Sequence, residues 1–217
     1  MSKVSLVLFM DQELETGDRI LIEAEQLFFR NGVKSITMDE IATHLGISKK
    51  TIYQFYKDKK ELVYKVVEAR IQKQQEEIDE IAETAIDPVH EVLLTSDWLK
   101  NVFQNMNPFL LMEVQKYYPR AYSAFQTHRD KCIFCNIFNN IKKGIASGLY
   151  RAGIDVDTIA RLRMVCIDAA FNPENFPLAK KNLNELQIQL IEHFLYGICT
   201  LKGHKLINKY KQIKEEE

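Results

Sequence analysis

The chain has little of what strands, long loops and catalytic motifs require. Its 217 residues include only 8 Gly and 5 Pro, and no segment alternates apolar and polar residues as a half-buried strand does. It contains no internal repeat, nucleophile elbow, phosphate-binding loop, dinucleotide fingerprint or H-E-x-x-H zinc motif. These absences predict an all-α protein that is not an enzyme and that needs no cofactor.

An excess of one charge is also missing, because 29 basic residues are balanced by 30 acidic ones. No overall field therefore draws the protein to nucleic acid or to an anionic membrane, and any such attraction has to be local. The apolar run from Val4 to Met10 is too short to span a membrane and lacks a small-residue cleavage site. We expect a cytoplasmic protein that makes no membrane contact.

Cysteines are few, and their placement does not favour disulfides. Cys132, Cys135, Cys166 and Cys199 are too unevenly spread for a disulfide framework, so we expect reduced thiols. Cys132 and Cys135 form a C-x-x-C pair, which raises the possibility of zinc or redox chemistry. The pair falls inside an expected helix and has no second ligand pair, so structural burial is the favoured interpretation and we predict no metal site.

What the sequence does have is apolar residues at helical spacing, within a hydrophobic content of 46%. Thr37 and Glu40 have the spacing of a capping box, Ser48 can cap another helix, and Gly32 and Gly46 suit helix ends. The expected N-terminal helices run from about 16 to 30, 37 to 45, 48 to 56 and 58 to 84. The two short helices and their glycine-containing turn predict a helix-turn-helix.

A local basic patch coincides with the second short helix. Five lysines lie between Lys49 and Lys60 against Asp58 alone. Ile52 and Tyr56 can close over the first helix, which leaves a polar face that suits a DNA groove: lysines neutralise phosphates, hydroxyls donate to them, and Gln54 can pair with an adenine edge. The alternative is that the lysines only solvate a helix face and that Tyr53 belongs to the core.

The stretch "FFRNGVKSITMDEIATHLGISKKTIYQFYKDKKEL" favours the DNA-binding alternative. From about Asp18 to Tyr64 the chain resembles the DNA-binding domain of the tetracycline-repressor (TetR) family of bacterial transcription regulators. The motifs that carry the resemblance are the Ala-x-x-Leu-Phe-x-x-x-Gly run ending at Gly32, Thr-x-x-x-Ile-Ala, Leu-Gly-Ile-Ser, Thr-Ile-Tyr and Lys-x-Lys-x-Glu-Leu. The resemblance implies a DNA-binding domain over residues 1–64 and a helical effector-binding and dimerisation domain over residues 65–217.

Nine residues are predicted to contact DNA on these grounds. Two of them depart from the commonest form of the motif: Lys50 adds positive charge where glycine is frequent, and Phe55 either touches a thymine methyl or packs inward. The predicted DNA-binding residues are Thr37, Met38, Lys49, Lys50, Thr51, Tyr53, Gln54, Phe55 and Lys59.

The region after residue 86 is rich in aromatic residues, which either line an effector pocket or fill a solid core. Asp168 stands in an apolar helical stretch, where it can pair with an arginine, border a ligand or lie at a subunit contact. His128 and Glu113 are weaker candidates for ligand contacts. The predicted ligand-binding residues are Trp98, Phe109, Tyr122, Phe125, Phe138 and Asp168.

The remaining helices are expected to begin at Pro88, Pro108 and Pro119, the last one continuing to about Gly148, and then to span 155–172 and 183–201. In the resembled family the last two helices form a four-helix dimer interface, whereas their apolar stripes can also face only their own subunit. We predict a homodimeric repressor that binds an operator in double-stranded DNA and is released by a small molecule. The alternative is a DNA-binding regulator without a small-molecule effector, controlled by a protein partner or by its own abundance.

Overall fold

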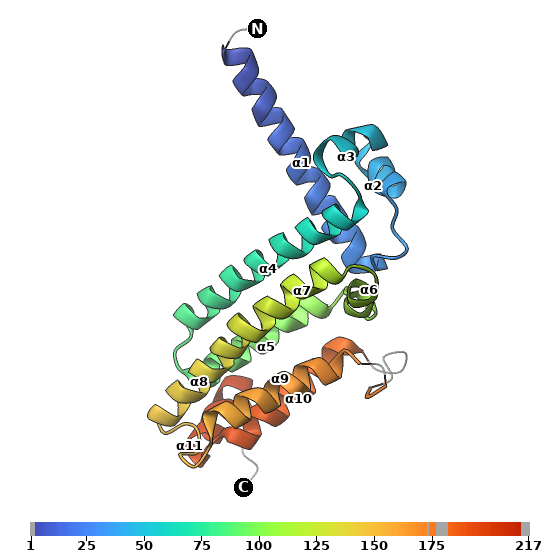
Figure 1. Cartoon of the computed structure of the whole chain (residues 1–217). Coiled ribbons are helices and arrows are strands. Elements are labelled where there is room, and N and C mark those ends of the chain that lie inside the picture. Colours follow the sequence, from blue (N-terminus) through green and yellow to red (C-terminus); the bar gives the residue numbers. More distant parts are fainter. Residues whose placement is uncertain (1–2, 173, 177–181, 214–217) are drawn as a thin grey trace. The chain divides into compact units, whose positions relative to one another are not determined.

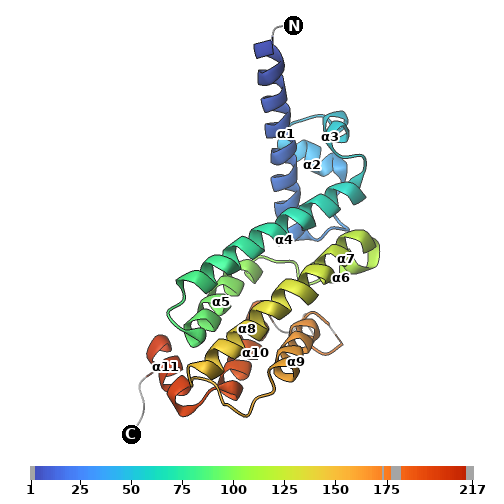
Figure 2. The same cartoon turned by 60° about the vertical axis from the view of Figure 1, so that its left-hand side comes forward.

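The computed structural model describes residues 3–172, 174–176 and 182–213, with side chains from Thr16 onward. Regular structure in these ranges is helical, apart from one antiparallel bridge between Tyr150 and Cys199, so the expected all-α class is confirmed (Figures 1 and 2). None of the described helices is long and apolar enough to cross a membrane. The elements are α1 (Lys3–Asn31), α2 (Met38–Leu45), α3 (Lys49–Phe55), α4 (Lys59–Thr84), α5 (Pro88–Phe103), α6 (Leu110–Tyr117), α7 (Pro119–His128), a π-helical turn η1 (Arg129–Ile133), α8 (Phe134–Ala146), α9 (Val156–Ala170), α10 (Leu183–Ile198) and α11 (Leu201–Lys211).

The predicted caps set the ends of the short helices. Thr37 Oγ1 accepts from the Glu40 amide at 3.2 Å, and the Glu40 carboxylate accepts from the Thr37 amide at 2.6 Å, which completes the capping box of α2. Gly46 ends α2 with a φ of 66°, a left-handed conformation that glycine adopts without strain. Ser48 Oγ accepts from the Thr51 amide at 3.1 Å and starts α3.

Three boundaries differ from the sequence prediction. Helix α1 begins at Lys3 and not near Thr16, and no glycine or proline between those positions interrupts it. The helix expected over 119–148 contains the π-helical turn η1. The last expected helix ends at Ile198, and a further helix, α11, follows because Thr200 caps it through the Gly203 amide at 3.3 Å.

The chain forms two compact units. Unit 1 comprises Met1–Ile71 and Asn105–Phe125, and unit 2 comprises Gln72–Gln104 and Gln126–Glu217. Helices α4 and α7 each contribute residues to both units. The functional boundary predicted after residue 64 stays a prediction.

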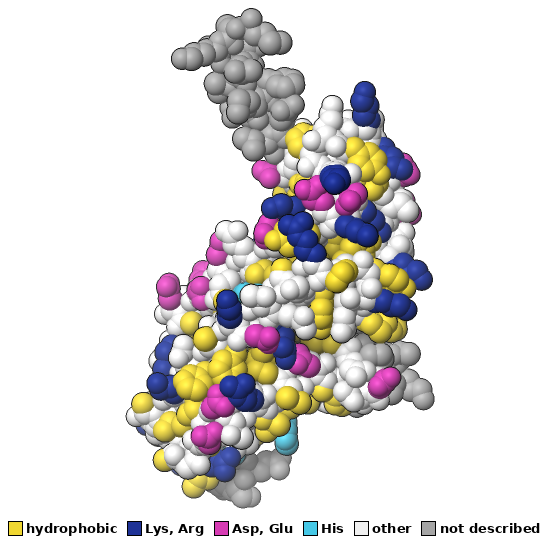
Figure 3. All heavy atoms as spheres, viewed as in Figure 1, with side chains coloured by type: hydrophobic (Ala, Val, Ile, Leu, Met, Phe, Trp, Pro, Cys, Tyr) yellow, Lys and Arg dark blue, Asp and Glu magenta, His cyan; other side chains and the backbone are white. Residues whose placement is uncertain are grey.

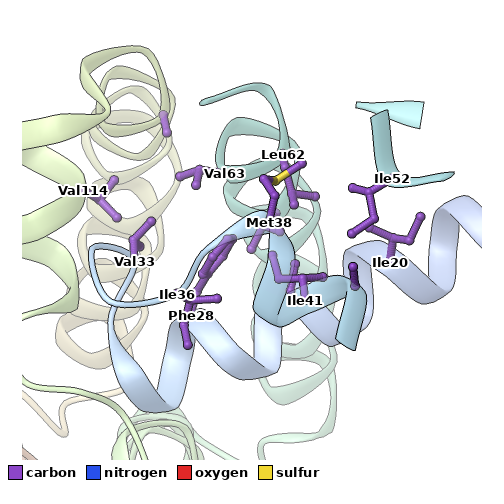
Figure 4. Close-up of a cluster of buried hydrophobic side chains, with 14 residues drawn as sticks. Ile20, Phe28, Val33, Ile36, Met38, Ile41, Ile52, Leu62, Val63 and Val114 are labelled. Atoms are coloured by element: carbon purple, nitrogen blue, oxygen red, sulfur yellow. The ribbon is translucent and has the colours of Figure 1, made fainter. Parts of the chain in front are cut away.

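The core of unit 1 joins α1, α2, α3, α4 and α6 (Figure 4). In Figure 4, Ile52 of α3 faces Ile20 of α1, and Met38 of α2 lies beside Leu62 of α4. Val114 of α6 is 5% exposed and belongs to the same cluster, so helix α6 is part of the packing that holds the helix-turn-helix.

Unit 2 is a helical bundle in which α5 packs against α10, α8 and α11, while α9 packs against α8 and α10. Its buried cluster includes Val89, Leu195 and Ile207. Tyr150 is 1% exposed, and its hydroxyl donates to the Pro88 carbonyl at 2.9 Å. Because burial removes this phenol from water, its pKa is raised far above the ordinary value and it stays neutral.

Candidate nucleic-acid interface

Helix α3 presents one apolar and one polar face, as the sequence predicts. Ile52 is fully buried in the core of unit 1, whereas the Tyr53 side chain is 44% exposed and those of Lys50 and Gln54 are exposed. The exposed set supplies a cation, a phenol and an amide, which are the groups that contact phosphates and adenine edges in a major groove.

Polar residues at the helix starts already have partners within the unit. Lys49 Nζ lies 2.7 Å from Asp39 Oδ2, and this hydrogen bond raises the pKa of the lysine. Thr51 Oγ1 lies 2.9 Å from the hydroxyl of Ser48. Thr37 donates its hydroxyl to Glu40 at 2.9 Å. These side chains remain near the protein surface, and any further contact through them would compete with the Lys49–Asp39 ion pair and the two capping contacts.

Two predicted DNA contacts point into the protein. The side chain of Met38 is 5% exposed and sits in the unit 1 core. Phe55 is half-buried, packs on the same core and lies over Gly17, where an added Cβ would be 3.2 Å from the ring. The structure therefore shows for Phe55 the inward packing that the sequence left open.

Lys59 is also held inside unit 1. Its Nζ donates to the Val33 carbonyl and lies 5.8 Å from the ring centroid of Phe28 and 6.0 Å from that of Tyr118. Burial lowers the pKa of Lys59. The exposed lysine in the first turn of α4 is Lys60, which is absent from the predicted DNA contacts because the sequence pattern does not tell adjacent lysines apart.

Lys60 borders an open groove of about 610 Å³ in unit 1. Lys34 also lines this groove, and its Nζ is 5.9 Å from the ring centroid of Tyr117. Figure 3 shows Lys and Arg side chains over α6 and the helix-turn-helix, with hydrophobic side chains and some Asp and Glu side chains among them. The groove is lined by Lys34, Asp58, Lys59, Lys60, Tyr117 and Tyr118.

The predicted ligand-binding residues divide between the units. In unit 1, Phe109 is 40% exposed, and the rings of Tyr122 and Phe125 lie 6.3 Å apart. In unit 2, Trp98 Nε1 donates to Glu77 at 2.8 Å, and the Phe138 ring lies 5.9 Å from that of Phe134. No single unit holds the whole set.

Asp168 forms an ion pair with Arg129, one of the three alternatives that the sequence left open. Glu113 accepts from the Lys34 amide at 2.8 Å and so fixes the turn between α1 and α2. His128 is half-buried, and desolvation lowers its pKa. Cys132 is partly buried and Cys135 is exposed, both as free thiols, so the burial expected of the pair is wrong for Cys135. The described residues contain no group of three His, Cys, Asp or Glu that could hold a metal ion.

Comparison with known proteins supports the helix-turn-helix assignment. The family described as "Bacterial regulatory proteins, tetR family" matches residues 20–66. The chain is 33% identical over 191 residues to the uncharacterized HTH-type transcriptional regulator YvaF of Bacillus subtilis, covering 84% of this chain and 95% of that protein.

Solved structures share the fold at lower identity. A TetR-family transcriptional regulator from Agrobacterium tumefaciens superposes with a TM-score of 0.72 at 18% identity, covering 87% of this chain and 100% of that one. FadR from B. subtilis, in complex with stearoyl-CoA, gives 0.61 at 18% identity, covering 83% and 98%. The helix-turn-helix geometry, the matched family and a relative similar along nearly its whole length show that this chain belongs to the TetR family of bacterial transcriptional regulators and is not an enzyme.

Proposed function

We propose that the protein is a cytoplasmic repressor that binds a pseudopalindromic operator as a homodimer and releases it when a small molecule binds. The observation that carries the proposal is the division of α3 into a buried and an exposed face, with Ile52 inside and Lys50, Tyr53 and Gln54 outside. The rival is a regulator without a small-molecule effector.

In the proposed complex, α3 enters the major groove and Gln54 reads an adenine through its amide. Tyr53 donates to a phosphate, and Lys50 and Lys60 neutralise the backbone. Since each neutralised phosphate releases counterions, the affinity falls as salt is added, with a slope of about −0.9 per phosphate contact.

The proposed effector site lies in unit 2, near Trp98, Phe138 and Asp168, while Phe109, Tyr122 and Phe125 remain candidates in unit 1. Support comes from the similar fold of FadR, whose structure contains stearoyl-CoA. The effector has to bind the DNA-free conformation more tightly than the DNA-bound one, and by linkage operator DNA weakens effector binding by the same factor.

Helix α4 is the proposed mechanical connection. Its 26 residues correspond to about 39 Å of uninterrupted helix, which starts next to α3 and ends in unit 2. A small tilt at the far end moves its first turn, and with it the recognition helix, relative to the dimer axis.

The test is a gel-shift titration with DNA from upstream of the protein's own gene, at several salt concentrations. Lys50→Ala should weaken binding and flatten the salt dependence, whereas Tyr53→Ala should weaken binding with little change in the salt slope because it removes no cation. Gln54→Ala should cost about 1–3 kcal/mol and relax base preference at one position. Lys73→Ala, an exposed lysine of α4 in unit 2, is the control and should bind as the wild type does. If the α3 variants also match the wild type, α3 is not the recognition helix.

A further inference from the structure

Arg163 is buried in unit 2 without an anionic partner. It lies on α9 between the buried residues Ala160 and Met164, and it is 6% exposed. Among the described residues its side chain forms no ion pair or hydrogen bond, and its Nη1 is buried without a partner. Its guanidinium carbon lies 5.7 Å from the ring centroid of Phe194 on α10, and the thiol of Cys166, three residues later on α9, is close enough to act on its charge.

The guanidinium remains charged at neutral pH. Burial lowers the pKa of Arg163 to about 10, which is still well above 7. A positive charge removed from water and left unpaired destabilises a fold, because the lost hydration is not replaced. Such a group is therefore expected where an anion supplies the missing interaction.

The carboxylates of the surrounding helices do not supply it. Helix α8, which packs against α9, contains no acidic residue. On α9, Asp157 bonds to Arg161 at 2.7 Å and Asp168 pairs with Arg129. On α10, the other helix packed against α9, Glu192 pairs with Lys211 and Glu185 is exposed.

A second buried donor lies on α10. Gln187 is 2% exposed, and its Nε2 has no hydrogen-bond partner. It is seven residues before Phe194, so the two lie about two turns apart on the same face of α10. One turn earlier, Asn184 Oδ1 is an unpaired buried acceptor. The α9–α10 layer thus contains a cation, an amide donor and an amide oxygen with unfilled hydrogen-bonding capacity.

The buried position of Arg163 indicates that its guanidinium does not serve a contact between subunits. Leu162 and Val165 are 54% and 61% exposed and mark the outer face of α9. Arg163 shares instead the buried face of Ala160 and Met164. A second copy of the chain packed on the outer face would meet the two apolar side chains and not the guanidinium.

We propose that Arg163 is the anchor for an anionic group, a carboxylate or a phosphate ester, of a ligand bound in the α9–α10 layer, with the Gln187 amide as a second donor. A guanidinium fits these anions because its planar fork donates two parallel hydrogen bonds. If this ligand is the effector that releases DNA, the proposal rests on the proposed function and specifies the chemical class of that effector. Binding of the anion itself is measurable without DNA.

The experiment is thermal unfolding of the full chain at constant ionic strength with matched probes. The anionic probes are octanoate, decanoate, phenylacetate and phenyl phosphate, and each is paired with the corresponding neutral amide or alcohol. At least one anion should raise the Tm by about 3 °C at tenfold its Kd, and its neutral partner should not. Whether a carboxylate or the phosphate ester acts identifies the anion.

Arg163→Met should raise the Tm of the free protein and weaken binding of that anion at least tenfold. Arg163→Lys keeps the charge without the fork, should give an intermediate affinity and decides the case if the methionine variant does not fold. The control is Arg161→Met, which removes an exposed guanidinium two residues earlier on the same helix. This variant should bind the anion as the wild type does.

Three outcomes would overturn the proposal: no anion stabilises the wild type, the Arg163 variants bind as the wild type does, or they change dimer dissociation without changing the response to the probes. Gel shifts with the same anion separate the two proposals. Binding that depends on Arg163 but does not release DNA would reject effector-controlled repression and leave the anion site in place.

Discussion

Two adjacent lysines at the start of α4 are expected to have different roles. Lys60→Met should reduce DNA affinity and lower the slope of log affinity against log salt by about 1, because its exposed ammonium is free for a phosphate. Lys59→Met should leave that slope nearly unchanged and reduce the free energy of unfolding by about 1–2 kcal/mol, because its ammonium binds the Val33 carbonyl inside unit 1.

Fluorescence anisotropy with labelled operator over a salt series gives the slopes, and urea unfolding gives the stabilities. Each variant serves as the control for the other, since the charge change is the same. A stable Lys59→Met protein whose salt slope has fallen would show that this ammonium leaves the carbonyl to bind DNA.

At this scale the sequence predicted the faces of α3 but not every side chain. Helical periodicity was sufficient for Ile52 and Tyr53, since both lie within the helix. Met38, Phe55 and Lys59 lie at helix ends. There the direction of a side chain depends on contacts with α1 and the Val33 carbonyl, and the spacing of residues in the sequence does not predict such contacts. The partner of Asp168 was equally unreadable, because Arg129 lies on another element.

At the scale of helices, Gly144 allows α8 to pack on Tyr150. A Cβ at Gly144 would lie 2.0 Å from the Tyr150 ring, and the tyrosine is fixed by hydrogen bonds to Pro88 and Asn140. Gly144→Ala should therefore reduce the free energy of unfolding by about 2–3 kcal/mol through overpacking.

Chemical denaturation at one protein concentration measures this loss. Gly197→Ala is the matched control, because a Cβ there meets nothing within 4 Å, and the substitution should increase stability by up to about 1 kcal/mol through helix propensity. Equal effects of the two substitutions would contradict the packing of Tyr150 against α8.

Caps made the helix boundaries predictable, since Thr37, Ser48 and Asp87 each mark a start by a local rule. Helix α11 was missed although Thr200 is a comparable signal, because apolar spacing up to Leu201 favoured one longer helix. The turn η1 has no local sequence rule of this kind: its wider hydrogen bonding replaces an ordinary α-helical turn without any proline or glycine.

For the whole molecule, the outer face of α9 gives a test of dimerisation. Leu162→Glu should convert the expected dimer to monomer at micromolar concentration, because it places a charge in the proposed apolar interface. Leu201→Glu is the control: the helix expected over 183–201 ends at Ile198, and Leu201, 83% exposed, begins α11 and not α9 or α10, the two helices proposed to form the interface, so the variant should remain dimeric. Light scattering measures the oligomeric state of each variant, and a monomeric wild type would contradict the proposed interface.

The sequence did not predict which segments of the chain make up unit 1. Residues 105–125 were assigned to the effector domain because resemblance to the family ends before them. Contacts far apart in the sequence place them in unit 1, as when the Asn107 amide donates to the Phe29 carbonyl at 2.8 Å and Glu113 binds the Lys34 amide. Periodicity identifies helices such as α6 but not their partners.

This membership has a consequence for chimeric regulators, in which the DNA-reading part of one protein is grafted onto the sensing part of another. A graft joined within α4 would transfer the helix-turn-helix but leave Val114 and Ala121, both members of its core, with the donor of the other half. The transplanted part would then keep the exposed face of α3 but lose the contact of Glu113 with the turn at Gly32 and Lys34. A functional exchange therefore requires that both segments of unit 1 be transferred, residues 105–125 together with the N-terminal segment.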